Sequence, residues 1–218
     1  MNPAAEFCTK FFISYLLGSI SGGMLMGKIK HVDLRQMGSG NAGGTNALRT
    51  MGTQFAFAVL FIDVIKGFIA VQFISSLNIN GFLMGGEINI EKLAIVCGCG
   101  AVLGHVYPLY YNFKGGKGAG TMVGVLLALF PAGLATCLLF WGVSLILTGY
   151  VGLSTIIAGI ILPISTAFYF EGGLGTSFGI FSMIISLFII FTHWSNIKRM
   201  LHGNENRFEK AMIFRKNT

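Results

Sequence analysis

Long apolar runs without strict alternation of apolar and polar positions dominate the chain. The runs cover residues 11–26, 55–77, 93–111, 119–147, 151–170 and 174–193. About 20 apolar residues cross the hydrocarbon core of a bilayer as a helix, at about 1.5 Å of rise per residue. A bilayer admits only helices or closed barrels, and barrel strands alternate, so these runs predict membrane-spanning helices.

The fourth run, 119–147, is too long for one comfortable span, and Pro131-Ala132-Gly133 interrupts it. We divide it there, so the sequence predicts an all-α polytopic membrane protein with seven transmembrane helices in a single domain, residues 1–218. Residues 119–130 would form only about 18 Å of helix. As an alternative, this segment dips into the membrane and returns.

The composition agrees with this class, because 54% of the residues are hydrophobic and 11% are charged. Soluble domains are about a quarter charged, and disordered chains are poor in aromatic residues, which make up 13% here. The four cysteines lack the paired CxxC elements of a zinc site, and we interpret them as packing residues. The first run is long and no small-residue cleavage site follows it, so we expect it to remain as a span.

The basic residues sort by membrane side. With the N-terminus outside, one face collects twelve of the fifteen: Lys28, Lys30, Arg35, Arg49, Lys114, Lys117, Lys198, Arg199, Arg207, Lys210, Arg215 and Lys216. The other face keeps Lys10 and Lys92. The positive-inside rule makes the crowded face cytoplasmic and places the C-terminus there. This accounts for the net charge of +7 without nucleic acid as a partner, with an anionic substrate as a second contributor.

The first polar segment on this face, residues 38–52, reads GSGNAGGTNALRTMG. Its opening matches GxGxxG, but it follows a membrane span and not a strand, which excludes a dinucleotide fold. We expect a glycine-rich turn and a short helix from Thr45, where backbone N–H groups and the helix dipole favour an anion. Candidate phosphate ligands are Ser39, Gly40, Asn41, Thr45, Asn46 and the forked guanidinium of Arg49. In the alternative, the glycines serve only helix packing.

The second segment, residues 104–121, reads GHVYPLYYNFKGGKGAGT. It is not a P-loop, because a glycine replaces the required Ser or Thr after the lysine. Backbone approach and a point-charge ammonium still suit phosphate. The candidates are Lys114, Gly115, Gly116, Lys117 and Gly118. His105 is open to roles as ligand, base or structural residue.

The third segment, residues 192–208, reads THWSNIKRMLHGNENRF. Helical spacing predicts His193, Asn196 and Arg199 or Met200 on one face. A histidine there could accept a proton, and an asparagine could orient a hydroxyl. Alternatively, the basic residues are topological anchors, a role that His202 also fits.

Asp63 and Lys66 lie one helical turn apart in the middle of the second apolar run. Unpaired charges there cost about 2.5 to 3.5 kcal/mol each, so we predict that they pair or face a protein interior. Both transport and a structural clasp are compatible with this pattern.

Together the three segments resemble the bacterial acyl-phosphate:glycerol-3-phosphate acyltransferase family over the length of the chain. The resemblance rests on SGNAGGTNALR, GHVYPLYYNFKGGKGAGT and HWSNIKRMLHGNENRF, with DVIKG from Asp63 and YVGLSTI from Tyr150 in support. Family members commonly read SGNxGATN and GGKGVAT, from which Gly44 and Ala119-Gly120 depart. They commonly carry a serine at the position of Gly152, and this sequence departs from that pattern; Ser154 is the candidate for a substrate contact here.

The resemblance implies seven spans, an outside N-terminus, and an active site facing the cytoplasm in a bacterial cell membrane. It also implies transfer of an acyl group from acyl phosphate to the 1-hydroxyl of sn-glycerol 3-phosphate, the first step of phospholipid biosynthesis. Apart from the two substrates and membrane lipids, it implies no metal, cofactor or obligate protein partner. Ser39, Arg49 and Lys117 would bind phosphate, His193 and Asn196 would hold the glycerol phosphate, and Glu205 would brace the tail.

Two other classes of protein are alternatives to this family. Acyltransferases that use acyl-coenzyme A or acyl-carrier protein carry His-x4-Asp, and none of the four histidines has an aspartate five residues on. A transporter predicts polar groups from both halves near the midplane, whereas here they gather at one face. No nucleophile–base–acid triad is visible, so we expect direct attack, with His193 or a substrate phosphate oxygen taking the proton.

Overall fold

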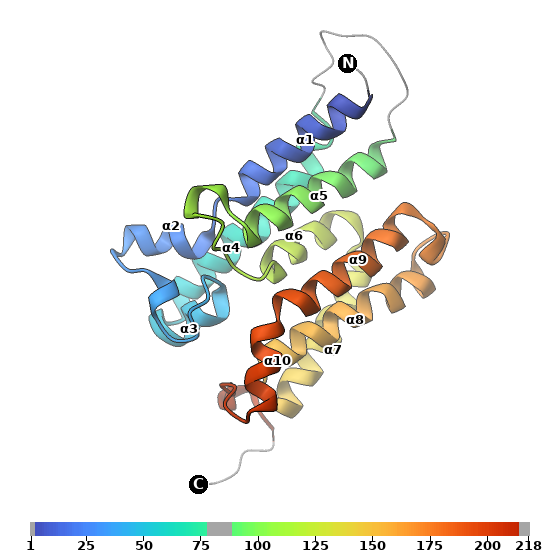
Figure 1. Cartoon of the computed structure of the whole chain (residues 1–218). Helices are drawn as coiled ribbons and strands as arrows, with labels where there is room; N and C mark the ends of the chain where they lie inside the picture. The colour runs from blue at the N-terminus through green and yellow to red at the C-terminus, as the bar shows by residue number, and fades with distance from the viewer. Residues whose placement is uncertain (1–2, 78–88, 214–218) are drawn as a thin grey trace. The chain divides into compact units, whose positions relative to one another are not determined.

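The computed structural model describes residues 3–77 and 89–213, and these residues form helices and no strand. The chain divides into two compact units, Met1–Leu129 and Phe130–Thr218. The first holds α1 (Pro3–Gly18), α2 (Gly22–Ile29), α3 (Gly44–Met51), α4 (Thr53–Ile69), α5 (Ile90–Val106) and α6 (Ala119–Leu129), and the second holds α7 (Pro131–Thr148), α8 (Val151–Tyr169), α9 (Ser177–Thr192) and α10 (Trp194–Leu201) (Figure 1). The all-α class is confirmed for the described residues. The single domain stays a prediction.

Five helical stretches are long and apolar enough to cross a membrane: Pro3–Ile29, Thr53–Ile74, Ile90–Tyr111, Pro131–Thr148 and Val151–Tyr169. α9 and α10 pass the same test together, although they bend by 52° at their junction. α6 is apolar but covers only 11 residues, and a new helix begins at Pro131, as the division of the fourth run predicted. The helical membrane architecture is therefore confirmed, while seven full crossings and their orientation stay predictions.

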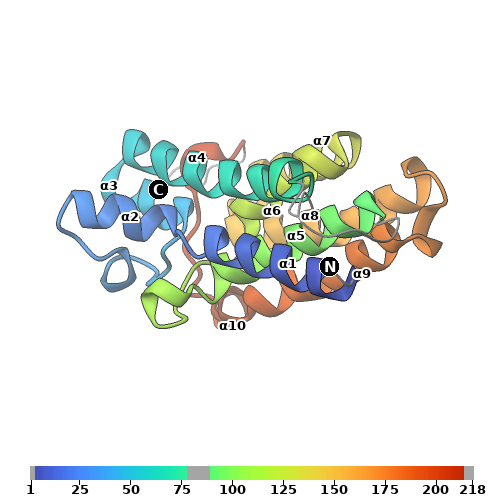
Figure 2. The ribbon, with the colours of Figure 1, turned by 90° about the horizontal axis from the view of Figure 1, so that it is seen from above.

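Close backbone approach at glycines holds the first unit together. α1 lies along α5 in both ribbon views (Figures 1 and 2), and a Cβ atom added to Gly104 would lie 2.2 Å from the carbonyl oxygen of Tyr15. α4 and α6 approach as closely, since a Cβ on Gly124 would lie 1.9 Å from the Val64 carbonyl oxygen. Small residues at such crossings let helices in a membrane gain van der Waals contact.

The second unit packs α7 against α8 and α8 against α9. Pro131 begins α7 because the first helical position needs no N–H donor. An aromatic cluster lies at the start of this unit, with Phe170 and Phe178 stacked at 4.4 Å between ring centroids and Phe130 edge-on to both.

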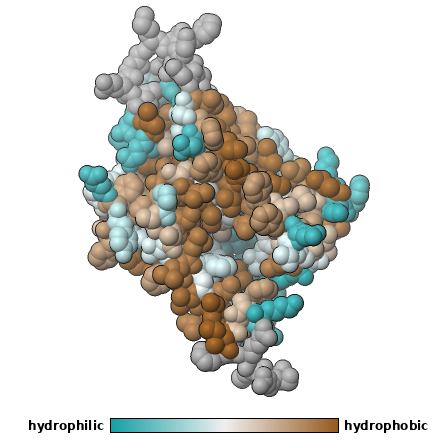
Figure 3. Space-filling view, turned by 180° about the vertical axis from the view of Figure 1, so that it is seen from behind, coloured by the Kyte–Doolittle hydropathy of each residue, from teal (hydrophilic) through white to brown (hydrophobic). Residues whose placement is uncertain are grey.

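Apolar side chains also cover much of the surface. Those more than half exposed include Phe57, Phe61, Leu139, Ile184, Leu187 and Phe191. In the space-filling view, brown side chains occupy most of the described surface on the face shown (Figure 3). Lipid tails solvate such a surface, so it agrees with a membrane protein.

The first apolar run lies within the candidate span Pro3–Ile29, but the helix is interrupted there, because α1 ends at Gly18 and α2 begins at Gly22. In a continuous helix the Gly22 N–H would donate to the Gly18 carbonyl. Here Gly22 N donates to Asp63 Oδ1 at 3.0 Å, and the Gly18 carbonyl accepts from Lys66 Nζ at 2.8 Å. Asp63 and Lys66 of α4 thus bind the two backbone groups that lack their helical hydrogen bond. The sequence of residues 11–26 alone does not predict these partners.

Candidate active site

The glycine-rich segment before α3 is a turn organised around Asn46. Its side chain is 1% exposed, its Nδ2 lies 2.9 Å from the carbonyl oxygens of Leu34, Met37 and Asn41, and its Oδ1 accepts from Ser39 N at 2.9 Å. We expected Asn46 as a phosphate ligand. The structure corrects this, because contacts within the loop occupy its amide.

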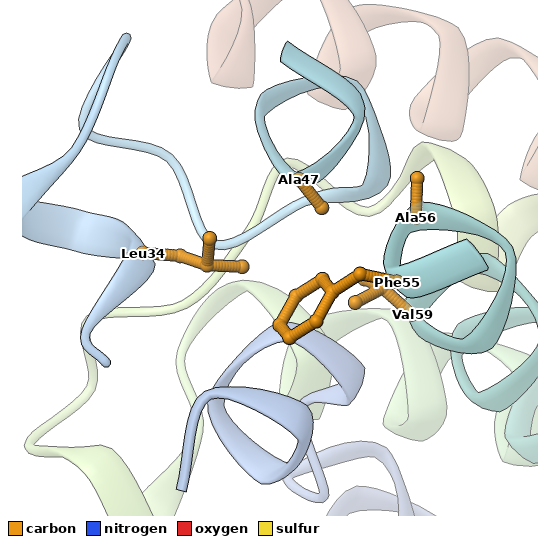
Figure 4. Close-up of a cluster of buried hydrophobic side chains, with 5 residues drawn as sticks. All are labelled: Leu34, Ala47, Phe55, Ala56 and Val59. Carbon is orange, nitrogen blue, oxygen red and sulfur yellow. The ribbon is translucent and has the colours of Figure 1, made fainter. Parts of the chain in front are cut away.

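An apolar cluster fixes this turn on α4. Leu34, Ala47, Phe55, Ala56 and Val59 point toward one another from the loop, α3 and α4 (Figure 4). Gly38 adopts φ +55°, and a Cβ there would lie 2.4 Å from Asn46 Oδ1, so a side chain is excluded on two grounds. Apolar packing against α4 and hydrogen bonds within the loop therefore both fix the turn.

An ion pair stiffens the entrance to the turn. Arg35 Nη2 donates to Asp33 Oδ2 at 2.8 Å, and Asp33 also caps the short 3₁₀ helix Leu34–Gln36 by accepting from Arg35 N. The hydrogen bonds from Arg35 lower the pKa of Asp33 below its usual value. The charge of Arg35 is therefore already partnered within the loop.

The remaining predicted groups of this segment lie at the margin of the turn and on α3. Ser39, Asn41, Thr45 and Arg49 are each partly exposed, and Gly40 is exposed with φ +73°. α3 begins at Gly44, one residue before the start that the sequence predicted at Thr45. No side chain caps its first turn. Arg49 lies in the last turn of this helix.

The second segment folds back onto the end of α5. Gly115 N donates to the Val106 carbonyl and Gly116 N to the His105 carbonyl, both at 3.1 Å. These two N–H groups cap α5, so they are not available to a phosphate, and the expected ligand role of Gly115 and Gly116 reduces to shaping the loop. Gly118 adopts φ +89° where the chain turns into α6.

The lysines of this segment differ in exposure. Lys114 is exposed, whereas Lys117 is partly buried next to the start of α6. A partly buried lysine keeps more of its attraction for a phosphate than an exposed one, because water screens it less. Lys117 is thus the better placed of the two predicted phosphate ligands.

The two glycine-rich segments meet the same stretch of α4. A Cβ on Gly44, at the start of α3, would lie 3.7 Å from Leu60 Cβ, and one on Gly120, at the start of α6, would lie 3.6 Å from Leu60 Cδ1. The first turns of two helices, each following a glycine-rich loop, therefore flank one side chain. The first unit gathers the two predicted phosphate segments at this place.

Asp63, Lys66 and His105 form a buried polar cluster beside this place, each 2% exposed. Lys66 Nζ lies 3.1 Å from Asp63 Oδ1 and 2.9 Å from His105 Nδ1. The pairing predicted for Asp63 and Lys66 is present. Because both charges also bind the backbone of the α1–α2 break, the geometry agrees with the structural clasp and gives no support to transport.

In the second unit, His193 stands at the bend between α9 and α10. The face expected from His193 to Arg199 belongs to α10, for which His193 is the N-cap, while α9 ends at Thr192. The His193 Nδ1 and the Thr192 hydroxyl both approach the carbonyl oxygen of Ile189, at 2.8 and 3.1 Å. Side chains that take terminal carbonyls in this way end or bend a helix, which explains the 52° change of direction.

Asn196 and Glu205 form a buried polar pair in the same unit. Asn196 Nδ2 donates to Glu205 Oε1 at 2.8 Å, and Arg199 Nε donates to Glu205 Oε2 at 2.5 Å. Glu205 therefore ties α10 to the loop after it. Asn196 is seated against α8, where a Cβ on Gly152 would lie 2.6 Å from its Nδ2.

Ser154 does not fit its predicted role. It is 0% exposed, and its hydroxyl donates to the Tyr150 carbonyl at 3.0 Å and lies 3.3 Å from Ser144 Oγ. The contact with Ser144 joins α8 to α7. We therefore assign Ser154 to helix packing and not to substrate contact.

Sequence reasoning also missed a buried ion pair near the N-terminus. Lys10 Nζ binds Glu6 Oε1 at 2.8 Å and the Ser75 carbonyl at 2.7 Å. The i, i+4 spacing of Glu6 and Lys10 on one helix was the signal that could have revealed it.

The class of the protein follows from these observations: a helical integral membrane protein with two glycine-rich loops beside one helix and a polar cluster at the end of its last apolar helix. A model of the family "Glycerol-3-phosphate acyltransferase" matches residues 9–203. The chain therefore belongs to the glycerol-3-phosphate acyltransferase family.

Individual relatives agree over nearly the whole chain. Glycerol-3-phosphate acyltransferases of Chlorobium phaeobacteroides and Prochlorococcus marinus (strain MIT 9215) are 37% and 40% identical, over 90% and 91% of this chain and 94% and 96% of their own lengths. Two crystal structures of PlsY (YgiH), described as an integral membrane glycerol 3-phosphate acyltransferase, align with TM-scores of 0.78 and 0.77 at 37% and 35% identity. They represent the glycerol 3-phosphate and lysophosphatidic acid forms, and the alignments cover 93% and 92% of this chain and 95% and 94% of theirs.

Proposed function

We propose that this protein transfers an acyl group from an acyl phosphate to the 1-hydroxyl of sn-glycerol 3-phosphate, releasing lysophosphatidic acid and phosphate. The family match over residues 9–203 carries the proposal, because it includes the first two polar segments and residues 192–203 of the third. The two similar crystal structures, named for glycerol 3-phosphate and lysophosphatidic acid forms, support this acceptor and product. The donor and the residue roles are our own inference.

The phosphate ligands in this proposal are Ser39, Arg49 and Lys117. Both substrates carry phosphate, and a guanidinium fork and an ammonium are the groups that bind it with charge-assisted hydrogen bonds. The meeting of the two glycine-rich segments at Leu60 supports a shared binding place for these groups in the first unit.

The reaction needs a proton acceptor for the glycerol hydroxyl. The hydroxyl oxygen attacks the acyl carbonyl carbon, the new ester bond forms, and the bond to the phosphate oxygen breaks with its electron pair leaving on phosphate. A carbonyl oxygen only accepts, so the His193 Nδ1 beside the Ile189 carbonyl carries a proton. In the neutral ring, Nε2 then holds the lone pair, which suits His193 as the base.

Asn196 holds the glycerol phosphate, and Glu205 positions Asn196. The buried carboxylate that binds the Asn196 amide supports this division of roles. Phosphate is a good leaving group and acyl phosphate is already activated, so positioning supplies much of the rate. The proposed setting is the cell membrane of a bacterium, with seven spans, an outside N-terminus and an active site facing the cytoplasm.

The test is lysophosphatidic acid formation by the detergent-purified protein from labelled glycerol 3-phosphate. Palmitoyl phosphate and palmitoyl-coenzyme A are offered in separate reactions, and a preparation without enzyme is the control. Product with acyl phosphate alone is expected. Product with the thioester alone would overturn the donor, and absence of product in a folded preparation would overturn the reaction.

The base is tested separately with His193→Ala. We expect kcat to fall by about 100-fold or more, since general base catalysis contributes about 10²–10⁴-fold. His202→Ala, an exposed histidine just past the end of α10, is the matched control. Near-normal turnover of His193→Ala would transfer the base role to a substrate phosphate oxygen.

A further inference from the structure

The cluster of Asp63, Lys66 and His105 reaches from the α1–α2 break to the loop that carries Lys117. Lys66 Nζ donates to the carbonyl oxygens of Gly18 and Ile20, both at 2.8 Å. Its remaining proton faces Asp63 Oδ1 and His105 Nδ1. One edge of the imidazole ring is thus fixed by a buried charge pair that is itself anchored to the backbone.

The other edge of the His105 ring supports Gly116. A Cβ added to Gly116 would lie 2.1 Å from His105 Nε2, 2.9 Å from Cε1 and 3.1 Å from Cδ2. The Gly116 N–H donates to the carbonyl of the same histidine. The imidazole ring and the carbonyl group of His105 therefore fix the backbone position of Gly116, one residue before Lys117.

The two glycines of this loop are constrained by different atoms. A Cβ on Gly115 would collide with main chain, 2.1 Å from the His105 carbonyl oxygen and 2.9 Å from that of Val106. At Gly116 the three nearest atoms all belong to the His105 side chain. Shortening that side chain would therefore make room for a methyl group at 116 but not at 115.

We propose that His105 is a positioning residue for Lys117: the Asp63–Lys66 pair fixes the imidazole, and the imidazole fixes the Gly116–Lys117 backbone. Residue 116 must be glycine because the imidazole ring of His105 occupies the space of a Cβ atom, not because a substrate contacts the backbone there. This inference rests on the proposed role of Lys117 as a phosphate ligand. It gives the buried charges of α4 an effect on substrate binding without contact to substrate.

The first experiment is a double-variant cycle in the full-length protein, with KM and kcat measured for both substrates. Gly116→Ala should lower kcat/KM by about 10- to 100-fold, since small misplacements of binding groups have effects of that size. His105→Asn keeps a polar atom near the Nδ1 position and removes the ring below Gly116. The double variant should regain at least about fivefold over Gly116→Ala.

Gly115→Ala is the matched control, and His105→Asn should not rescue it. Failure of rescue at Gly116 would overturn the steric part of the inference, as would equal rescue at both positions. Thermal unfolding of the same variants gives the same double-variant comparison for Tm. It tests the contact between ring and glycine even if the wild-type protein shows no acyltransferase activity, so failure of the proposed function remains distinguishable.

The second experiment asks whether His105 acts through Lys117. We expect His105→Asn to raise the same KM that Lys117→Ala raises, with a smaller change in kcat. The double variant His105→Asn/Lys117→Ala should be no worse than Lys117→Ala alone within about twofold. Multiplicative losses in the double variant, or a loss in kcat alone, would show an effect that does not pass through Lys117 and would overturn the assignment.

Discussion

The carboxylate of Glu205 offers a sharp test of the second unit, because Glu205→Gln changes one oxygen into an NH₂ group. In the structure its two oxygens accept from Asn196 Nδ2 at 2.8 Å and Arg199 Nε at 2.5 Å. An amide retains one acceptor. Its NH₂ group must face one of the two donors, so one hydrogen bond is lost and the other no longer has an ionised acceptor.

The magnitude follows from these two bonds. Hydrogen bonds to charged groups contribute about 1.5–3 kcal/mol, and neutral ones about half as much. The Arg199 side chain is 29% exposed and regains water, so we expect a loss at the lower end, about 2 kcal/mol in the free energy of unfolding. For a chain of this length, that corresponds to a fall of about 4–8 °C in Tm.

The assay is thermal unfolding in one detergent at fixed protein concentration, followed by kcat/KM for glycerol 3-phosphate at a temperature where both proteins are folded. Glu171→Gln is the matched control, since Glu171 is an exposed glutamate of the same unit. We expect no change beyond about 1 °C for the control, as is usual for surface substitutions. A Glu205→Gln protein with unchanged Tm and unchanged kcat/KM would refute the brace and the positioning of Asn196.

Three further predictions concern the first unit. Arg49→Lys keeps the charge and loses the fork, so kcat/KM should fall at least about tenfold; a normal value in the acyltransferase assay would contradict the phosphate role. Asn46→Ala leaves the Ser39 N–H without its acceptor and should lower the free energy of unfolding by about 1–3 kcal/mol, measured by thermal unfolding against Asn41→Ala, whose partly exposed side chain should matter less. Because the pKa of Asp33 is lowered in the folded protein, its stabilising pair is fully formed above about pH 4 and is lost as the pH falls through the lowered value. Asp33→Asn should therefore flatten the dependence of Tm on pH below about pH 4, and a profile parallel to wild type would argue against this pair.

Local signals in the sequence were enough to predict the helical membrane class and several element boundaries. Apolar length predicted the spans, Pro131 predicted a new helix, and the glycine-rich turn predicted the start of α3 near Thr45. Each of these depends on a few neighbouring residues, since proline lacks a donor and long apolar runs must bury their backbone in helices.

The features that were missed depend on contacts between distant residues. The α1–α2 break exists because Lys66 binds Gly18 and Ile20, 48 and 46 residues earlier in the chain. Asn46 was predicted to face a ligand, but carbonyl groups of its own loop surround it. Residue type suggested phosphate chemistry for Gly116, and only the folded chain shows that its N–H is donated to the end of α5.

The break between α1 and α2 has a consequence for the order of assembly. A nascent chain inserts its first apolar segment before α4 exists, and bare carbonyl and N–H groups are costly in lipid. At that stage residues 18–22 satisfy their own groups best as continuous helix. The bend becomes favourable only when Asp63 and Lys66 are present to bind these groups, so we expect it to form as α4 packs against the first apolar segment.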